Sequence, residues 1–143
     1  MSSKVVSRKI NYHVDKKNGL SKQKLEQLLF DWKKKLLMDD WNIKLKIVDF
    51  ERKDFRQSGN FVADSVKKKA EILMTYDPWR GDEEYTLVHE MIHILMNDFD
   101  QFSEKFVIKN GKSDQDHETY LGQLEKVVHQ LTQSILGRPE PKG

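Results

Sequence analysis

The pentapeptide His89-Glu90-Met91-Ile92-His93 restricts the fold of this chain more than any other feature. Two histidines four positions apart project from one face of a helix, one turn above the other. In a helix, both imidazoles can therefore reach a single Zn²⁺ ion. Glu90 lies beside them, placed to take a proton from water. These residues predict a helix that carries two metal ligands and a general base.

The neighbouring residues favour this helix. Asp82 is a good N-cap, and Glu83 and Glu84 fall in the first turn, where the helix dipole favours acidic side chains. An apolar flank borders the polar face, as a half-buried active-site helix needs, and consists of Leu87, Val88, Met91, Ile92, Ile94 and Leu95. The alternative interpretation is a surface or core helix whose two histidines bind nothing.

Length and composition limit the classes of protein to consider. With 143 residues the chain is long enough to bury a core, so we expect a single domain over residues 1–143. It has no cysteine, so any metal ligand must be His, Asp or Glu. No apolar run approaches the length of a membrane span, and the first residues lack the hydrophobic stretch of a signal peptide. We therefore expect a cytoplasmic protein with no membrane partner.

The net charge of +2 conceals an uneven distribution of charge. Residues 1–35 contain ten Lys or Arg and three acids, whereas residues 82–125 contain eleven acids and three Lys. A basic arm can bind nucleic acid or an acidic partner. More often such lysines solvate the outer face of a helix, and no nucleic-acid motif accompanies them here. Nucleic acid is therefore an open but not a favoured partner.

Periodicity predicts one helix and two or three strands before the pentapeptide. Residues 1–20 alternate only weakly and are interpreted as an N-terminal arm. Alternation over residues 41–48 predicts a strand with one buried face, and residues 61–66 and 70–76 are two further candidate strands. Ser21 can cap a helix whose apolar residues follow the helical period, namely Leu25, Leu28, Leu29, Trp32 and Leu36.

The pattern after the pentapeptide predicts a loop and a second long helix. Residues 98–112 are irregular and favour a loop or hairpin. A helix follows from Ser113 or Asp114 to Leu136, and residues 137–143 are expected to form a flexible tail. The expected fold class is α+β, with an N-terminal helix, a small two- to three-stranded sheet, the helix of the pentapeptide and a long C-terminal helix.

The strand before the pentapeptide suggests how a substrate could bind. Such a strand can lie at the sheet edge above the metal, where its backbone groups can pair with an extended peptide. Residues 67–76 are the candidate. Their three lysines, Lys67, Lys68 and Lys69, would also protect an exposed edge against aggregation, which is an alternative reason for their presence.

A catalytic zinc site requires three protein ligands and an open position, so one ligand must come from outside the pentapeptide. The first turn of the last helix offers Glu118, which would give a His₂Glu site, and His117, which would give a His₃ site. His117 is in phase with the apolar stripe of this helix, whereas Glu118 is offset by one residue, toward Glu125 and His129. Helical phase alone therefore favours His117.

The pentapeptide, the strand at Ala70-Glu71-Ile72 and the later His117-Glu118 helix together resemble small single-domain zinc metallopeptidases. The resemblance is greatest to minigluzincins and to short metallopeptidases of phages and mobile elements. It is more distant to the ImmA/IrrE-like and SprT-like groups. It extends over residues 25–135 and implies a zincin-like fold, one zinc ion and the hydrolysis of peptide bonds.

The resemblance also bears on the third ligand. Gluzincins use a Glu on a downstream helix, followed by apolar residues three and six positions later. Glu118 matches this pattern with Leu121 and Leu124, so the resemblance favours Glu118. SprT-like proteins use a third His instead, which keeps His117 open.

The expected function is therefore that of a zinc-dependent peptidase acting on a peptide or protein substrate. His89, His93 and Glu118 would hold one Zn²⁺ ion, and Glu90 would act as general base on a metal-activated water. Three tyrosines, Tyr76, Tyr85 and Tyr120, are candidate donors to the developing oxyanion. The alternatives are a zinc-binding regulatory or interaction module that cleaves nothing, and a nucleic-acid adaptor that uses the basic arm.

Overall fold

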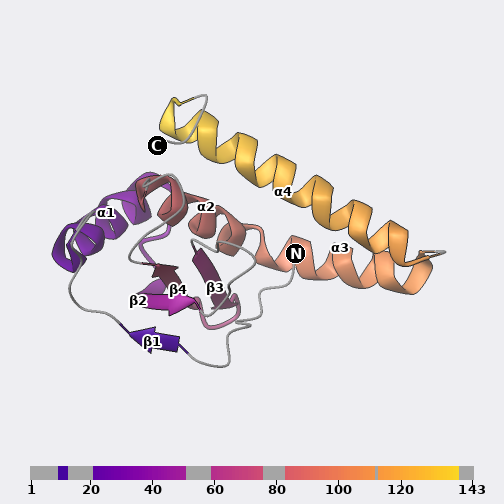
Figure 1. Cartoon of the computed structure of the whole chain (residues 1–143), viewed down its shortest axis with the longest axis horizontal. Coiled ribbons are helices and arrows are strands. Elements are labelled where there is room, and N and C mark those ends of the chain that lie inside the picture. Colours follow the sequence, from indigo (N-terminus) through magenta and orange to yellow (C-terminus); the bar gives the residue numbers. More distant parts are fainter. Residues whose placement is uncertain (1–9, 13–20, 51–58, 76–82, 112, 139–143) are drawn as a thin grey trace.

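The chain folds into an α+β structure in which helices pack with a mixed sheet (Figure 1). This computed structural model describes residues 10–12, 21–50, 59–75, 83–111 and 113–138. Within them, the helices are α1 (Lys22–Lys35), α2 (Glu83–Leu95), α3 (Asn97–Asn110) and α4 (Asp114–Leu136). The strands are β1 (Ile10–Tyr12), β2 (Asn42–Phe50), β3 (Gly59–Asp64) and β4 (Lys69–Thr75).

The sheet has the strand order β1-β2-β4-β3. β2 and β4 are parallel, whereas β1 pairs with β2 and β3 pairs with β4 in antiparallel orientation. The prediction that residues 67–76 form the edge strand is therefore wrong, because β4 has a neighbour on each side. In the turn after β3, the Asp64 carboxylate accepts hydrogen bonds from the backbone N–H groups of Val66 and Lys67. This turn reverses the chain, so that β4 lies between β3 and β2. Among the described strands, β1 and β3 are the two edges of the sheet, and β3 is the edge beside β4.

The first helix and the strands agree with the periodicity of the sequence. Ser21 is the N-cap of α1, and its hydroxyl accepts a hydrogen bond of 3.2 Å from the Lys24 backbone N–H. The apolar faces of α1, β2, β4 and α2 meet in one hydrophobic core. Its fully or nearly fully buried members include Leu25, Leu29, Ile47, Ile72, Met74, Leu87, Val88 and Met91. Because α2 contributes one face to this core, its orientation is fixed before any metal binds.

Residues 98–112 were expected to form a loop or hairpin, and this prediction is wrong because most of them form α3. The sequence did not predict this helix because its apolar side chains face solvent and its polar side chains face the fold. Phe99, Phe102 and Phe106 are largely exposed, whereas Asn97 and Asp100 are buried. A helix of this kind lacks the inward apolar stripe by which surface helices are recognised in a sequence.

The last helix confirms the predicted span and lies against both α2 and α3 (Figure 1). Gly137 ends it in the left-handed conformation, with φ of 67°. The next residue, Arg138, forms an ion pair of 2.8 Å with Glu84 on α2, so the first two residues of the predicted tail are held by the fold. Residues 139–143 of that tail lie outside the described residues, as does the predicted N-cap Asp82. None of the helices that the structure describes combines the length and apolarity of a bilayer span.

Candidate metal centre

The two histidines of the pentapeptide lie on α2, one turn apart, as the sequence predicts. Their ring centroids are 4.9 Å apart, and the rings are inclined at 73° to each other. The His93 side chain is only 2% exposed, whereas 20% of the His89 side chain is accessible. One imidazole therefore lies in the protein interior and the other at its boundary with solvent.

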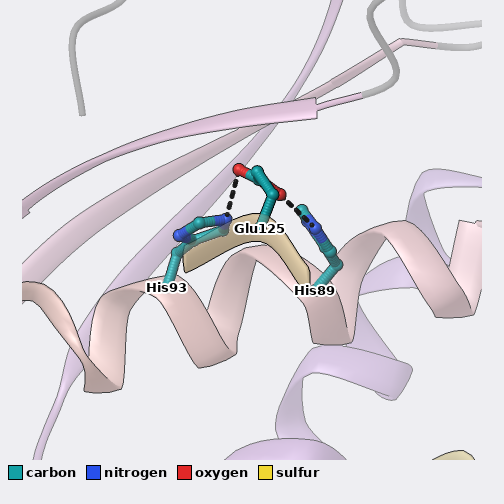
Figure 2. A group of neighbouring side chains, drawn as sticks. All are labelled: His89, His93 and Glu125. Atoms are coloured by element: carbon teal, nitrogen blue, oxygen red, sulfur yellow. Dashed lines mark hydrogen bonds and ion pairs between the residues drawn. The ribbon is translucent and has the colours of Figure 1, made fainter. Parts of the chain in front are cut away.

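Glu125, on α4, points its carboxylate at both histidines. Its Oε1 is 3.2 Å from His89 Nε2, and its Oε2 is 3.2 Å from His93 Nε2. Figure 2 shows the carboxylate lying between the two imidazole rings. The histidines and Glu125 lie on two different helices, and His93 and Glu125 are 32 positions apart in the sequence. The packing of α4 on α2 therefore brings them together.

The spacing of these side chains fits a metal ion. One ligand atom from each of His89, His93 and Glu125 lies within 4.8 Å of the others. In a tetrahedral zinc site with metal–ligand distances near 2.05 Å, the ligand atoms are about 3.3 Å apart. The two His–Glu distances of 3.2 Å are close to that value. The three side chains also form a His₂Glu set, one of the ligand sets that catalytic zinc sites use.

A second observation concerns unsatisfied atoms. His93 Nε2 and Glu125 Oε2 are buried, and within the described part of the chain neither atom makes a hydrogen bond, although they lie 3.2 Å apart. A buried polar atom without a partner costs roughly 1–3 kcal/mol. A cation bound by both atoms would remove that cost.

The protonation of the group follows from the same geometry. Burial lowers the pKa of His89, but hydrogen bonds with the carboxylates of Glu125 and Glu90 outweigh burial and raise it to about 10. Burial raises the pKa of Glu125, yet its hydrogen bond with His89 and the His93 imidazole 3.2 Å away hold that pKa well below its usual range. The cation-free group is thus a carboxylate paired with a protonated imidazole. A metal ion bound here would take the place of the proton, because ligation requires a neutral imidazole and an ionised carboxylate.

Glu90 lies between this group and the edge strand. It is 6% exposed, and its Oε2 is 3.2 Å from His89 Nδ1. When Nδ1–H donates to Glu90, Nε2 is left unprotonated toward Glu125, which is the tautomer that metal binding needs. The strand passes close by at Gly59, where a Cβ atom would lie 2.8 Å from Thr86 Cγ2 and 3.2 Å from Glu90 Oε2. Glycine at this position therefore allows the start of β3 to lie directly against Glu90.

An aromatic ring stacks on each of the two imidazoles. The buried ring of Phe61, on β3, stacks on His93 with centroids 5.4 Å apart and planes inclined at 17°. Tyr85, one turn before His89, stacks on that imidazole at 5.9 Å. The Tyr85 hydroxyl is hydrogen-bonded to Nδ1 of His129, which lies one turn after Glu125 on α4. Nothing in the sequence singles out Phe61, and the sequence favoured a place near the helix surface for His129 over a supporting role beside the ligands.

The structure does not bring the predicted third ligand to this place. Glu118 is exposed, and it lies seven residues, or about 10 Å along α4, before Glu125. His117 is not in the group either, because its Nε2 is 2.9 Å from Glu104 on α3. The physical reason is that the first turns of α4 lie against α3, where His117 meets Glu104, whereas α4 lies against α2 from Glu125 onward.

The rule that selected Glu118 applies equally to the residue that takes its place. Glu125 is followed by Val128 three positions later and by Leu131 six positions later. This spacing is present in the sequence, but it does not state which turn of α4 meets α2.

Comparisons with protein-family models, with curated proteins and with solved structures found no match. The pentapeptide and the geometry of the side chains around it are therefore the features that bear on function.

Proposed function

We propose that this chain is a zinc-dependent peptidase with a zincin-like arrangement, in which His89, His93 and Glu125 hold one Zn²⁺ ion. The observation that supports this best is the Glu125 carboxylate, which lies 3.2 Å from Nε2 of each histidine. Three protein ligands leave a position open for water or substrate, which distinguishes a catalytic zinc site from a structural one. The resemblance to gluzincins points the same way, with Glu125 in the role first given to Glu118.

Glu90 is the general base of the proposed reaction. When bound, zinc supplies Lewis-acid chemistry: it makes water more acidic and polarises a peptide carbonyl. Glu90 takes one proton from water as the new C–O bond forms, and then gives that proton to the leaving amine as the C–N bond breaks. Its burial beside His89 gives the carboxylate one fixed position next to the ligands.

Tyr85 is the proposed donor to the developing oxyanion. Of the three tyrosines considered, Tyr76 lies outside the described residues, and Tyr120 donates to the side chain and backbone of Asp100 on α3. Tyr85 alone of the described pair lies against a candidate ligand, His89. Its hydrogen bond with His129 would orient the hydroxyl and stabilise negative charge nearby when that imidazole is protonated.

The substrate is proposed to bind along β3 rather than along residues 67–76. β3 contacts the candidate metal centre through two residues: Gly59 lies against Glu90, and Phe61 stacks on His93. A peptide added as a further strand would place its carbonyl groups along this line. The Phe61 backbone N–H donates to Asn60 Oδ1 at 2.8 Å, so a bound peptide would replace that side chain as acceptor.

The decisive variant is Glu90→Gln, because it keeps the shape of the side chain and removes the base. We expect zinc content to stay at one ion per chain while hydrolysis of a fluorogenic peptide mixture falls by roughly 10²–10⁴-fold. Zinc is measured by plasma mass spectrometry on the same samples. Glu118→Gln is the matched control and should retain both properties, because Glu118 is exposed and outside the group.

Two results would contradict the proposal. Undiminished hydrolysis by Glu90→Gln would remove Glu90 from the reaction. A wild-type chain that binds zinc but cleaves nothing across a broad peptide mixture would indicate the non-catalytic zinc module instead.

A further inference from the structure

The outer face of α3 carries an aromatic stripe. We use this term for Phe99, Phe102 and Phe106, whose residue surfaces are 66%, 70% and 61% exposed. Spacings of three and four positions place the three rings on one face of the helix. The opposite face of α3 turns toward the rest of the fold, with Asn97 and Asp100 buried. The stripe is therefore a solvent-facing surface.

The size of the stripe is that of a functional patch. A phenylalanine side chain presents roughly 200 Å² when fully accessible, so the three rings together expose about 400 Å². The largest apolar patches on monomeric proteins measure about 300–600 Å² and are often binding sites. Two such stripes facing each other, with their polar borders, would bury about 1,000 Å² or more, the lower limit for a specific interface.

We propose that the aromatic stripe is the interface of a homodimer in which two copies of α3 pack antiparallel about a twofold axis. The spacing of the rings carries this assignment. Phe102 lies almost midway between Phe99 and Phe106, three residues from one and four from the other. With the axis near Phe102, Phe99 of one copy meets Phe106 of the other, and each Phe102 meets its own counterpart. A surface that complements itself in this way is what a twofold interface requires.

Charge complementarity supports the second copy as the occupant. Asp98 lies at the start of α3, and Lys105 and Lys109 lie toward its end. Separations of seven and eleven residues place each lysine within about 20° of Asp98 around the helix, so the three form one border of the stripe. Antiparallel packing sets Asp98 of each copy beside the lysines of the other. It also sets the two helix dipoles in opposite directions.

The inference does not depend on the proposed function. α3 contributes no side chain to the group formed by His89, His93 and Glu125. The oligomeric state can therefore be measured on metal-free or on zinc-loaded protein.

The first test is the mass of the full chain in solution, measured by sedimentation velocity over a range of micromolar concentrations. We expect wild type to sediment as a dimer. Phe102→Ser should raise the dissociation constant of the dimer roughly thirtyfold or more, as the loss of a central aromatic anchor does. Phe30→Ser is the matched control, because Phe30 is 54% exposed but lies on α1, and it should leave the mass unchanged. Circular dichroism of each variant checks that the fold is retained.

A charge exchange tests the antiparallel arrangement itself. Asp98→Lys should weaken the dimer, and so should the double variant Lys105→Glu/Lys109→Glu, because each sets like charges against each other. An equimolar mixture of the two should form a heterodimer that is tighter than either homodimer, since every contact then joins opposite charges. A monomeric wild type would overturn the proposal, and so would a dimer that Phe102→Ser leaves intact or a mixture without preferential pairing.

Discussion

α4 contributes to two clusters of polar side chains, one with α3 and one with α2, and the clusters differ in how many of their polar atoms have hydrogen-bond partners. Against α3, His117 is paired with Glu104 at 2.9 Å, and the Tyr120 hydroxyl donates to the Asp100 carboxylate at 2.7 Å. Each of these is a closed pair. Against α2, by contrast, Glu125 faces two histidines at once, and one nitrogen and one oxygen of that group lack hydrogen-bond partners among the described residues.

The comparison shows why residue type alone does not identify a metal site. Both clusters join a histidine and a carboxylate across a contact of α4 with a neighbouring helix, and helical phase favoured His117, which lies in the cluster of closed pairs. A His–Glu pair that satisfies itself stabilises a helix contact. A group of three in which two converging atoms lack hydrogen-bond partners can accommodate a cation that both atoms bind.

The largest expected difference between the clusters is in metal binding. Glu125→Gln should lower zinc affinity by more than about 100-fold, because even groups that only support a ligand are worth about 10–100-fold. Glu104→Gln is the matched variant of the other cluster and should lower zinc affinity far less, because it removes no ligand. Competition with a chromogenic chelator measures both. Equal losses in the two variants would mean that Glu125 acts through the stability of α4 and not as a ligand.

Zinc should also stabilise the fold, and only through the α2 cluster. At a free zinc concentration of 100 times Kd, binding to the native state adds about 2.7 kcal/mol to the free energy of unfolding. For a chain of this size, that raises Tm by roughly 5–10 °C. A thermal melt of metal-free protein with and without zinc measures the shift. It should vanish in His93→Ala and persist in His117→Ala.

A smaller effect is expected where the edge strand touches the α2 cluster. Gly59→Ala places a methyl group 2.8 Å from Thr86 Cγ2, and the branched Thr86 side chain is too stiff to turn aside. We expect a loss of about 1–3 kcal/mol in stability, with reduced kcat/KM and retained zinc, because β3 and Glu90 must move apart. Gly122→Ala is the control, since nothing lies within 4 Å of its added methyl group on α4. It should gain about 0.5–1 kcal/mol from helix propensity.

The two tyrosines provide the smallest and most selective contrast. Tyr120→Phe leaves the buried Asp100 carboxylate without its hydroxyl donor, so we expect a loss of about 1–2 kcal/mol in stability and no change in hydrolysis. Tyr85→Phe should do the reverse, lowering kcat while the denaturant midpoint stays nearly constant. If the two variants gave the same pair of effects, Tyr85 would have no role in the reaction.

Local patterns predicted most of the helices and strands. The spans of α1, α2 and α4 and the three longer strands follow from apolar periodicity, N-capping and turn residues, which act over a few neighbouring positions. The position of His89 and His93 on one helix face follows from the same local rule. The sequence did not predict α3, because the apolar face of this helix is the exposed one. It did not predict β1, because a strand of three residues is too short to show a periodic pattern.

What could not be predicted depends on how elements pack. Whether Glu118 or Glu125 reaches the histidines is decided by the turn at which α4 crosses α2, and both residues satisfy the same sequence rule. Whether β3 or β4 lies at the sheet edge is decided by strand order, which the alternation of residues within a strand does not contain.

Contacts on both sides of Glu125 determine how well its carboxylate is preorganised. The pair of His117 with Glu104 fixes α4 before it, and the pair of Arg138 with Glu84 fixes the chain after it. Glu84 also accepts a hydrogen bond of 2.8 Å from the Trp32 indole, so the same carboxylate joins α1, α2 and the end of α4. The affinity for a cation therefore depends also on residues that do not contact it. A substitution that frees either end of α4 would broaden the range of Glu125 positions and weaken ligation, although all three ligand residues were still present.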